Sequence, residues 1–387
     1  MSAIRRLGIL TSGGDCPGLN AAIRAVVSRA TLGYGWEVLG LPYATQGLLE
    51  RRAIRFTVHG FDRRGIDPLL STGGTVLGSI NRGDTEAQTA EILQGYRELG
   101  LDALVAIGGD GSLAILHHLA QQGGWKLVGI PKTIDNDVGL TQRSIGFDTA
   151  VNTVTEALAR LSYTAASHDR VMVVEVMGRE AGHLALQAGI AGGADAILLP
   201  EIPYRIADLH DSICDLRDRW NRRFAIIVVA EGAHNQRGEE LRLRDALGNC
   251  HYGGIGNDLA RRLSEYGNGE LDVRVTVLGH VQRGGMPSAF DRMMATVMGT
   301  HAVDSLANGE VGTMMTWQGD RCVAQSLQAV VEHSPLMVDP EGELVRAARG
   351  MGIYLGHPSA ASPRGPACPR QPVGNPRPRS GAVGSRV

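Results

Sequence analysis

Short apolar runs that end abruptly in glycine are the feature of this sequence that most restricts its fold. The runs "RLGIL", "LVAI", "RVMVVEVM", "IIVVA" and "RVTVLGH" lead into "TSGGDCPGLN", "GGDGS", "GREAGH", "EGA" and "VQRGG". Helical patterns lie between them, such as the apolar stripe of Ile23, Val26, Val27 and Ala30. Continuous apolar strands that alternate with helices indicate mostly parallel sheets covered on both faces.

The glycines show where such sheets would bind a ligand. The chain has 52 glycines in 387 residues, which is about twice the usual 7% share. Ligands of parallel sheets bind beyond the carboxyl ends of the strands, and the glycines gather at those ends. The strand and helix series is too long for one sheet, so we expect an α/β protein of two Rossmann-like lobes.

Composition and charge exclude several classes of function. The apolar and charged shares, 43% and 20%, are those of an ordinary globular protein. A formal charge of -2 gives no basic field for nucleic acid. No apolar run approaches the ~20 residues of a membrane span, and the start of the chain lacks a signal-peptide core. Scattered cysteines without C-x-x-C spacing predict a reduced, cytoplasmic protein.

The first Gly-rich turn is a candidate anion site. In "TSGGDCPGLN" a strand runs through Gly14 into a helix, and a helix N-terminus favours anions. An ordinary tight turn explains this segment equally well. The chain contains no P-loop consensus, and no ordered G-x-G-x-x-G follows the first strand.

Acidic residues at two other strand ends suggest catalysis. Asp110 in "GGDGS" lies among glycines, where a carboxylate would repel phosphate unless a cation stood between them, so it is a candidate Mg²⁺ ligand. A helix N-cap is the alternative. In "PKTIDND", Asp135 and Asp137 follow Thr133, and such a pair can divide proton abstraction and orientation between its members. A polar turn is the alternative there.

Basic residues complete the pattern. Arg170, Arg179, Arg274, His280 and Arg283 lie at strand ends or just after them. Arginine suits bidentate recognition of phosphate, although any single one is more often part of a surface ion pair. Cations, a candidate Mg²⁺ ligand, a hydroxyl-facing acid and phosphate-binding glycines together indicate phosphoryl transfer to an alcohol.

These segments resemble the 6-phosphofructokinase family. The resemblance covers most of residues 4 to about 335 and is carried, in family order, by "GILTSGGDCPGLNAAIR", "GGTVLGS", "ALVAIGGDGS", "PKTIDND", "GFDTAV", "SHDRVMVVEVMGREAGHLAL", "AGGADAILLPE", "AEGA" and "VTVLGHVQRGGMPSAFDR". It implies an ATP- and Mg²⁺-binding lobe of residues 1–145, completed by about 282–332, and a fructose 6-phosphate lobe of residues 146–281. The Pro- and Arg-rich segment 357–387 is predicted to be a disordered tail.

The resemblance also implies an activity and an assembly. The family transfers the γ-phosphoryl group of ATP to the 1-hydroxyl of fructose 6-phosphate, giving fructose 1,6-bisphosphate and ADP in glycolysis. Mg²⁺ accompanies the nucleotide. Arg170 and Arg274 reach the sugar phosphate of the adjacent subunit in this family, so we expect a homo-oligomer, either a dimer or a tetramer.

The remaining site residues follow from the resemblance position by position. Asp135 would be the general base, Arg179 would stabilise the transferring phosphoryl group, and Asp110 would bind Mg²⁺. The other catalytic candidates are Thr133, Asp137 and Lys132. The donor-binding candidates are Gly14, Arg82, Gly109, Asp110, Gly111 and Ser112. The sugar-phosphate candidates are Thr133, Ile134, Asp135, Arg170, Met177, Gly178, Arg179, Glu231, Arg274, His280, Val281, Gln282 and Arg283.

Two positions distinguish ATP-dependent from pyrophosphate-dependent members of this family, and in this sequence they indicate different donors. Gly111 leaves room for the nucleotide, where pyrophosphate users carry aspartate, whereas Lys132 is typical of pyrophosphate users. We give Gly111 more weight, because the missing side chain is a steric condition for ATP. The combination is also similar to a mixed subgroup that uses ATP. A pyrophosphate-dependent phosphofructokinase is the alternative.

Other departures concern donor contact and regulation. Asn81 stands where the family usually has a donor-contacting arginine, with Arg82 one step later. Arg24 matches the family's effector pocket, but Ser28 and Ser162 replace expected arginines. A non-catalytic sugar-phosphate-binding paralogue is a second alternative, and a nicotinamide dehydrogenase a third, although the ribose-binding acid of the dehydrogenases is missing.

Overall fold

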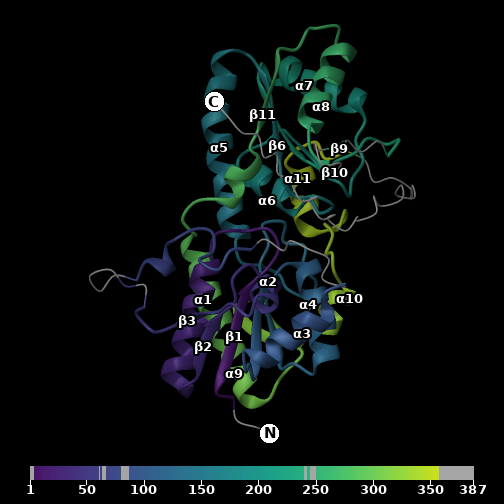
Figure 1. Cartoon of the computed structure of the whole chain (residues 1–387). Coiled ribbons are helices and arrows are strands. Elements are labelled where there is room, and N and C mark those ends of the chain that lie inside the picture. Colours follow the sequence, from purple (N-terminus) through teal and green to yellow (C-terminus); the bar gives the residue numbers. More distant parts are fainter. Residues whose placement is uncertain are drawn as a thin grey trace, which may run out of the picture.

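The chain forms two α/β lobes, one above the other (Figure 1). The computed structural model describes residues 4–60, 62, 67–79, 87–238, 242–244 and 250–356. The predicted tail, 357–387, lies outside the described residues.

The lower lobe is built on a seven-stranded sheet in the order β13-β12-β5-β4-β1-β2-β3. Its strands are β1 (Arg6–Thr11), β2 (Glu37–Gly40), β3 (Ile54–Phe56), β4 (Ala103–Gly108), β5 (Leu127–Pro131), β12 (Thr313–Gln318) and β13 (Arg321–Ser326). The central pairings are parallel, and only the edge strands β3 and β13 are antiparallel to their neighbours. The carboxyl ends of β1, β4 and β5 therefore meet at one edge.

Helices cover both faces of this sheet. They are α1 (Leu19–Ser28) with the π-turn η1 (Arg29–Gly33), α2 (Thr45–Leu49), η2 (Pro68–Leu70), α3 (Thr89–Glu98), α4 (Asp110–Gly123), α9 (Ala289–Asn308) and α10 (Leu327–Glu332). On β1, Leu7 and Ile9 belong to the core formed with α1 and α9, whereas Leu10 belongs to the core formed with α3 and α4. This two-sided burial explains the continuous apolar runs.

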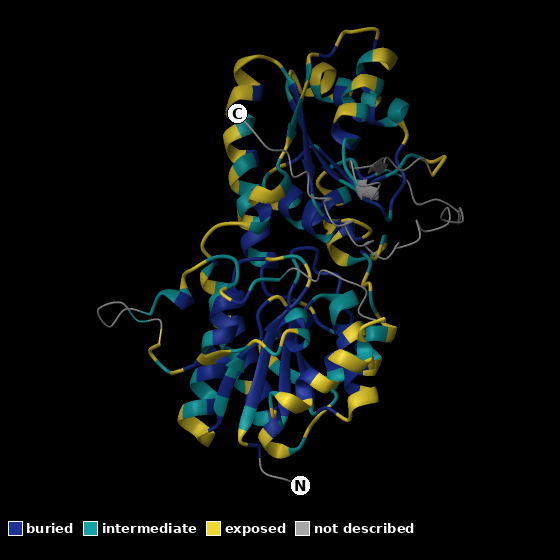
Figure 2. Ribbon diagram, in the orientation of Figure 1, coloured by how far each residue is buried: buried dark blue, intermediate teal, exposed yellow. Residues whose placement is uncertain are grey.

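The upper lobe holds a smaller, fully parallel sheet in the order β11-β6-β8-β7. Its strands are β6 (Val171–Val176), β7 (Ala196–Leu198), β8 (Ala225–Ala230) and β11 (Val273–Val277), and its helices are α5 (Phe147–Ser167), α6 (His183–Ala191), α7 (Ile206–Trp220), α8 (Ile255–Tyr266) and α11 (Glu343–Gly350). A hairpin of β9 (Arg242–Arg244) and β10 (Cys250–Tyr252) and the turn η3 (Gly279–Arg283) complete it. The central strands of both sheets are buried inside their lobes (Figure 2), whereas the edge strands β3, β11 and β13 are partly exposed. The predicted fold class is confirmed.

A buried carboxylate joins the two helices that meet between the lobes. Asp291, in the first turn of α9, is fully buried. It accepts hydrogen bonds from the Gly146 and Thr149 amides at 3.0 and 2.9 Å and from Thr149 Oγ1 at 2.5 Å. Ser288, the N-cap of α9, donates from its hydroxyl to Asp148 at 2.6 Å. These bonds fix the start of α5, and with it the upper lobe, against the lower lobe.

Candidate active site

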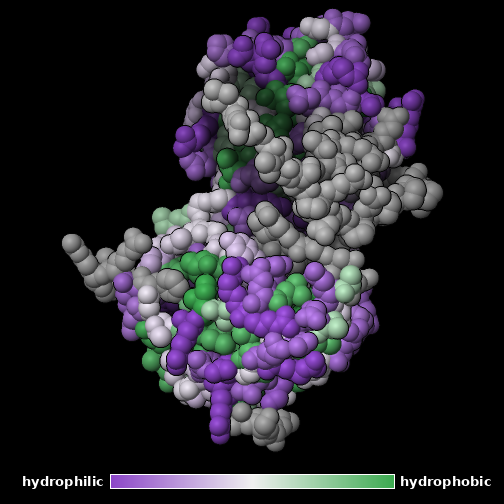
Figure 3. Space-filling model, in the orientation of Figure 1, coloured by the Kyte–Doolittle hydropathy of each residue, from purple (hydrophilic) through white to green (hydrophobic). Residues whose placement is uncertain are grey.

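A pocket opens at the waist between the lobes, where the carboxyl ends of the central strands meet. Segments after β1, β4 and β5 line it from the lower lobe, and Arg179 and Arg283 line it from the turns after β6 and β11. The lining residues are Gly13, Gly14, Asp15, Gly109, Asp110, Gly111, Ser112, Ile115, Lys132, Thr133, Ile134, Asp135, Asp137, Arg179 and Arg283. Hydrophilic side chains gather at this waist on the face shown in Figure 3.

The first Gly-rich turn packs too tightly for side chains. A Cβ on Gly14 would lie 1.8 Å from Arg283 Nη1, so Arg283 reaches across from the upper lobe and rests on this glycine. Gly13 has a left-handed φ of 84°, and a Cβ there would lie 2.9 Å from Ser112 Oγ and 3.0 Å from Lys132 Nζ. The turn is therefore more than an ordinary tight turn, because it forms one wall of the pocket.

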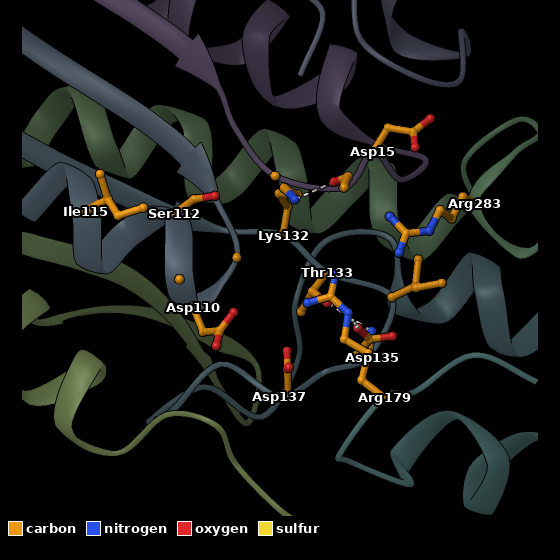
Figure 4. Close-up of a pocket in the computed structure, with 15 residues that line it drawn as sticks. Asp15, Asp110, Ser112, Ile115, Lys132, Thr133, Asp135, Asp137, Arg179 and Arg283 are labelled. Carbon is orange, nitrogen blue, oxygen red and sulfur yellow. Dashed lines mark hydrogen bonds and ion pairs between the residues drawn. The ribbon is translucent and has the colours of Figure 1, made fainter. Parts of the chain in front are cut away.

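Lys132 lies beneath this wall. Its ammonium donates a hydrogen bond to the Gly14 carbonyl, drawn as a dashed line in Figure 4. The residue is only 2% exposed, and burial lowers the pKa of its ammonium. The structure thus places a cation against the backbone of the glycine turn, on the border of the pocket.

Helix α4 points its N-terminus into the pocket. Gly109 is the N-cap and has no side-chain cap bond, so the interpretation of Asp110 as an N-cap is wrong. Asp110 lies in the first turn, and its carboxylate faces the space that also contains Asp137 (Figure 4). Ser112 Oγ accepts a hydrogen bond from Ser12 Oγ at 3.1 Å. Free amides at a helix N-terminus suit phosphate oxygens.

Two buried acids face the pocket from the turn after β5. Asp135 and Asp137 are 4% and 8% exposed. The Asp135 amide donates to Thr133 Oγ1 at 3.0 Å, and Asp135 Oδ2 lies 3.9 Å from Arg179 Nε. Among the described residues, Asp135 Oδ1 is buried without a hydrogen-bond partner. An ordinary polar turn would leave its carboxylates in water, so that interpretation does not hold here.

Burial makes these acids reluctant to ionise. Burial raises the pKa of Asp135, whereas the positive charge of Arg179 lowers it. Burial and the neighbouring Asp135 raise the pKa of Asp137 to about 7. Burial likewise raises the pKa of Glu231 to about 7. Perturbed acids gathered in a cleft are typical of catalytic sites.

Arg179 is held in an uncommon backbone conformation. Its φ is 42°, in the left-handed region, and its amide donates to Glu231 Oε1 at 3.2 Å. A Cβ on Gly232 would lie 1.7 Å from the Arg179 carbonyl oxygen, so only glycine fits there. Gly232 was not among the predicted site residues, although it follows the apolar run "IIVVA" in "EGA".

Among the other predicted sugar-phosphate residues, Met177 contacts Arg283, and His280, Val281 and Gln282 precede it in the turn η3. Met177 Sδ accepts a hydrogen bond from Arg283 Nε at 3.5 Å, and His280 and Val281 are exposed on η3. The Gln282 side chain is fully buried, accepts from the Met177 amide at 3.2 Å and donates to the Gly279 carbonyl at 2.9 Å. Because both ends of the amide bind backbone, this side chain joins η3 to the end of β6.

Arg170 and Arg274 lie at the opposite end of the small sheet. Arg170 precedes β6, Arg274 is the second residue of β11, and both bind Asp272, at 2.9 and 3.0 Å. A strand of this length separates them from Arg179 by roughly 15–20 Å at ~3.3 Å per residue. Within one chain, the basic residues at strand ends therefore form two separate groups.

Some residues singled out in the sequence, Arg24 and Ser162 among them, do not line this pocket in the described part of the chain. Asn81 and Arg82 lie outside the described residues. Arg24 forms an ion pair with Asp67, and Ser162 Oγ donates to the Leu158 carbonyl at 2.8 Å. Ile115 was not among the predicted site residues, but it is 41% exposed and lines the pocket one helical turn after Gly111.

The carboxylates fit a magnesium ion that is also bound by a ligand. Among the described residues, no group of three or more His, Cys, Asp or Glu side chains is arranged to hold a metal alone. Mg²⁺ is usually held by one or two carboxylates and by phosphate oxygens. Asp110 provides a hard carboxylate oxygen of the right kind.

Comparison with known proteins identifies the family. Residues 6–306 match the family described as Phosphofructokinase. The chain belongs to the phosphofructokinase family. It is 60% identical to ATP-dependent 6-phosphofructokinase 2 of Nostoc sp., over 91% of this chain and 99% of that protein. The predicted family is confirmed.

Solved phosphofructokinases share the fold. The structure of phosphofructokinase from Saccharomyces cerevisiae superposes with a TM-score of 0.71 and 32% identity, covering 85% of this chain and 45% of that one. This phosphofructokinase chain thus spans about half the length of the yeast chain. The pyrophosphate-dependent phosphofructokinase of Marinobacter aquaeolei, at 21% identity and a TM-score of 0.75, covers 93% of this chain and 94% of its own, and shows the fold alone. In the described residues, no helix is long and apolar enough to span a bilayer.

The raised pKa of Asp137 predicts a stability gain on removing its charge. The folded-state pKa of about 7 exceeds the ordinary value of 3.8, so the stability contributed by the neutral carboxyl is complete below pH 3.8 and is lost as the pH rises through 7. Asp137→Asn should therefore raise the free energy of unfolding near pH 8, by up to roughly 4 kcal/mol, and change it little near pH 4. Urea unfolding of the unliganded protein at both pH values measures this.

A surface carboxylate provides the control for this experiment. Asp304 forms an ion pair with Arg29 at 2.7 Å, and its side chain is 35% exposed. Asp304→Asn should not stabilise the protein at either pH, because an exposed ion pair contributes little. A free energy of unfolding for Asp137→Asn at or below the wild-type value near pH 8 would contradict the raised pKa.

Proposed function

We propose that this chain transfers the γ-phosphoryl group of ATP to the 1-hydroxyl of fructose 6-phosphate, the phosphofructokinase reaction of glycolysis. The observation that carries the proposal is the pairing of Asp135 and Arg179 in the pocket, at 3.9 Å, opposite the Gly-rich turn and the N-terminus of α4. The pocket thus contains a base, a cation and an anion-binding wall. The name of the Nostoc relative supports ATP as the donor.

Asp135 is the group that moves the proton. Its buried Oδ1 has no hydrogen-bond partner, so it can accept the proton of a sugar hydroxyl. Thr133 Oγ1 accepts from the Asp135 amide and fixes the turn. Arg179 faces Asp135 from the upper lobe, and its side chain is half exposed. Its guanidinium can stabilise the negative charge of the transferring phosphoryl group.

The donor occupies the side of the pocket formed by the lower lobe. The amides at the start of α4 and the Gly13–Gly14 turn bind phosphate oxygens, and Lys132 adds a positive charge from below. Asp110 would hold Mg²⁺ together with those oxygens. When bound, Mg²⁺ neutralises charge on the phosphates.

The sugar phosphate occupies the side formed by the upper lobe. Arg283, Met177 and His280 lie near the carboxyl ends of β6 and β11, and Glu231 lies beside the Arg179 turn. Arg170 and Arg274 point away from this site at the opposite end of the sheet. They serve the site of a neighbouring subunit, which makes the working unit a homo-oligomer, a dimer or a tetramer.

The alternatives find less support in the site. A non-catalytic paralogue would be expected to have lost Asp110, Asp135 or Arg179, and all three are present. A pyrophosphate user would be expected to carry an acid where this chain has Gly111.

Replacing the proposed base tests the mechanism. Asp135→Asn keeps the shape of the side chain but cannot take the hydroxyl proton, so kcat should fall by roughly 10²–10⁴-fold. Fructose 6-phosphate should still bind, because the arginines and His280 remain. Steady-state kinetics with ATP and a binding titration with the sugar phosphate measure both. A near wild-type kcat would remove Asp135 from this role.

Gly111 tests the choice of donor. It has no left-handed φ and lies in the first turn of α4, where an acidic side chain is tolerated by the backbone. Gly111→Asp should reduce kcat/KM for ATP far more than for pyrophosphate, because the new carboxylate meets the nucleotide and pyrophosphate has no group there. Gly111→Asn is the matched control that adds the same volume without charge. Unchanged ATP kinetics in both variants would show that position 111 does not face the nucleotide.

Mixing two inactive variants tests the shared site. An Arg274→Ala subunit and an Asp135→Asn subunit each lack a different part of the site. If Arg274 acts across the interface, hybrids formed under conditions of subunit exchange should regain activity that neither parent has. Exchange proven by mass spectrometry, with no recovery of activity, would place each complete site within one chain.

A further inference from the structure

Asn136 stands between the two acids of the pocket and has no contact with the pocket itself. It is 4% exposed and is absent from the pocket lining, whereas Asp135 and Asp137 both line it. Its φ is 54°, in the left-handed region that a non-glycine residue uncommonly adopts. A residue held in this conformation at the centre of an acid pair needs a stabilising partner.

The Asn136 amide has such partners on both of its ends. Oδ1 accepts a hydrogen bond from the Ser144 amide at 2.9 Å, and Nδ2 donates to the Gln142 carbonyl at 3.1 Å. Ser144 Oγ lies 3.1 Å from Asn136 Oδ1 and 2.9 Å from the Thr133 carbonyl oxygen. Ser144 is fully buried. We call these contacts between Asn136 and residues 142–144 the acid-turn clasp.

The clasp connects the acid turn to the start of α5. Ser144 leads directly to Ile145, whose carbonyl accepts from the Thr133 amide at 3.1 Å, and to Gly146, whose amide is held by Asp291. From there α5 runs into the upper lobe, which supplies Arg179 (Figure 1). The same short segment therefore fixes the acid turn and anchors the helix that leads to the opposing lobe.

The orientation of Asp135 depends on its backbone. Its Oδ1 has no hydrogen-bond partner, and its Oδ2 lies 3.9 Å from Arg179 Nε, too far for a hydrogen bond. A carboxylate with so few side-chain restraints takes its direction from the turn that carries it.

We propose that Asn136 is a positioning residue, whose clasp to residues 142–144 holds the turn in the left-handed conformation that directs Asp135 and Asp137 into one pocket. The inference rests on the proposed role of Asp135 as the base. Asn136 touches no reacting atom, and it acts by keeping Asp135 opposite Arg179.

The charges around Asp135 give this role a signature in the pH profile. Burial raises the pKa of Asp135, and so does Asp110, whereas Arg179, Arg283 and Lys132 lower it. If the clasp is lost and the Asp135 carboxylate turns away from Arg179 but stays buried, the largest lowering influence weakens. The pKa of Asp135 then rises, and the acidic limb of the kcat profile moves to higher pH.

Asn136→Gly is the variant of choice, because glycine keeps the left-handed backbone accessible and removes only the amide contacts. We expect kcat with ATP and fructose 6-phosphate to fall by roughly 10–10²-fold, since a misplacement of about 1 Å at a reacting group has this effect. KM for both substrates should change much less, and the acidic limb of kcat should move to higher pH. Steady-state kinetics across pH measure all three.

Asn221→Gly is the matched control. Asn221 also has a left-handed φ, 51°, but it is exposed at the C-cap of α7, far from the acid turn in sequence. This variant should keep the wild-type kcat and pH profile. If Asn136→Gly lowers the melting temperature but leaves kcat and its pH profile at the wild-type values, Asn136 only stabilises the fold and the proposal is wrong.

Ser144→Ala covers the case in which Asn136→Gly does not fold. It removes the hydroxyl contact and keeps the backbone amide that binds Asn136 Oδ1. We expect a smaller fall in kcat and a shift of the acidic limb in the same direction, and a wild-type profile would overturn the proposal. The Asp135→Asn assay tests the role of Asp135 as the base separately from the role of Asn136. An inactive Asp135→Asn enzyme together with a fully active Asn136→Gly enzyme would refute only the role of Asn136.

Discussion

Asp135 is a buried carboxylate whose ion-pair partner, Arg179, belongs to the other lobe. A charge withdrawn from water needs compensation, and here the compensation at 3.9 Å comes from across the waist. Neither lobe by itself therefore contains the chemistry of the site. Burial raises the pKa of the base, and the position of the other lobe determines how closely the Arg179 cation approaches it.

Because the site needs residues from both lobes, contacts that fix one lobe against the other are important to it. Asp291 binds the start of α5 through backbone amides, and the acid-turn clasp lies immediately before it in the chain. Arg283 rests on Gly14 from the opposite direction, and Gly232 allows the Arg179 carbonyl to pass at close range. Small residues and buried hydrogen bonds thus meet at the waist, because a shift there would separate the base from its partner.

The acids and the glycines of the site have opposite energetic roles. The glycine turn and the start of α4 offer backbone amides, which favour phosphate without any change of protonation. Burial raises the pKa of Asp135 and of Asp137 and so favours their neutral forms. A bound cation and the positive groups of the upper lobe favour the ionised carboxylates that proton abstraction needs.

Much of this site could be predicted from motifs that are local in the sequence. The Gly-Gly turn, "GGDGS" and "PKTIDND" each follow a strand, and parallel strands bring their carboxyl ends to one edge, so Gly14, Asp110 and Asp135 were expected together. The burial of the Gln282 side chain was not predictable in this way, because the sequence does not say which side of a turn a side chain takes. Asn136 went unnoticed for the same reason: its left-handed backbone and its contact with Ser144 do not appear in a pattern of residue types.

The family, the parallel sheets and the residue types that do the chemistry can be predicted from the sequence, because apolar periodicity and short motifs are properties of neighbouring residues. The packing of the two lobes determines which of those residues share a pocket. It placed Arg179 within 3.9 Å of Asp135 and left Arg170 and Arg274 at the far end of the same sheet, although all three arginines adjoin strands in the sequence. Which end of a strand a residue occupies, and what faces it across the waist, depends on how the two lobes pack. That packing is set by long-range contacts such as those of Asp291.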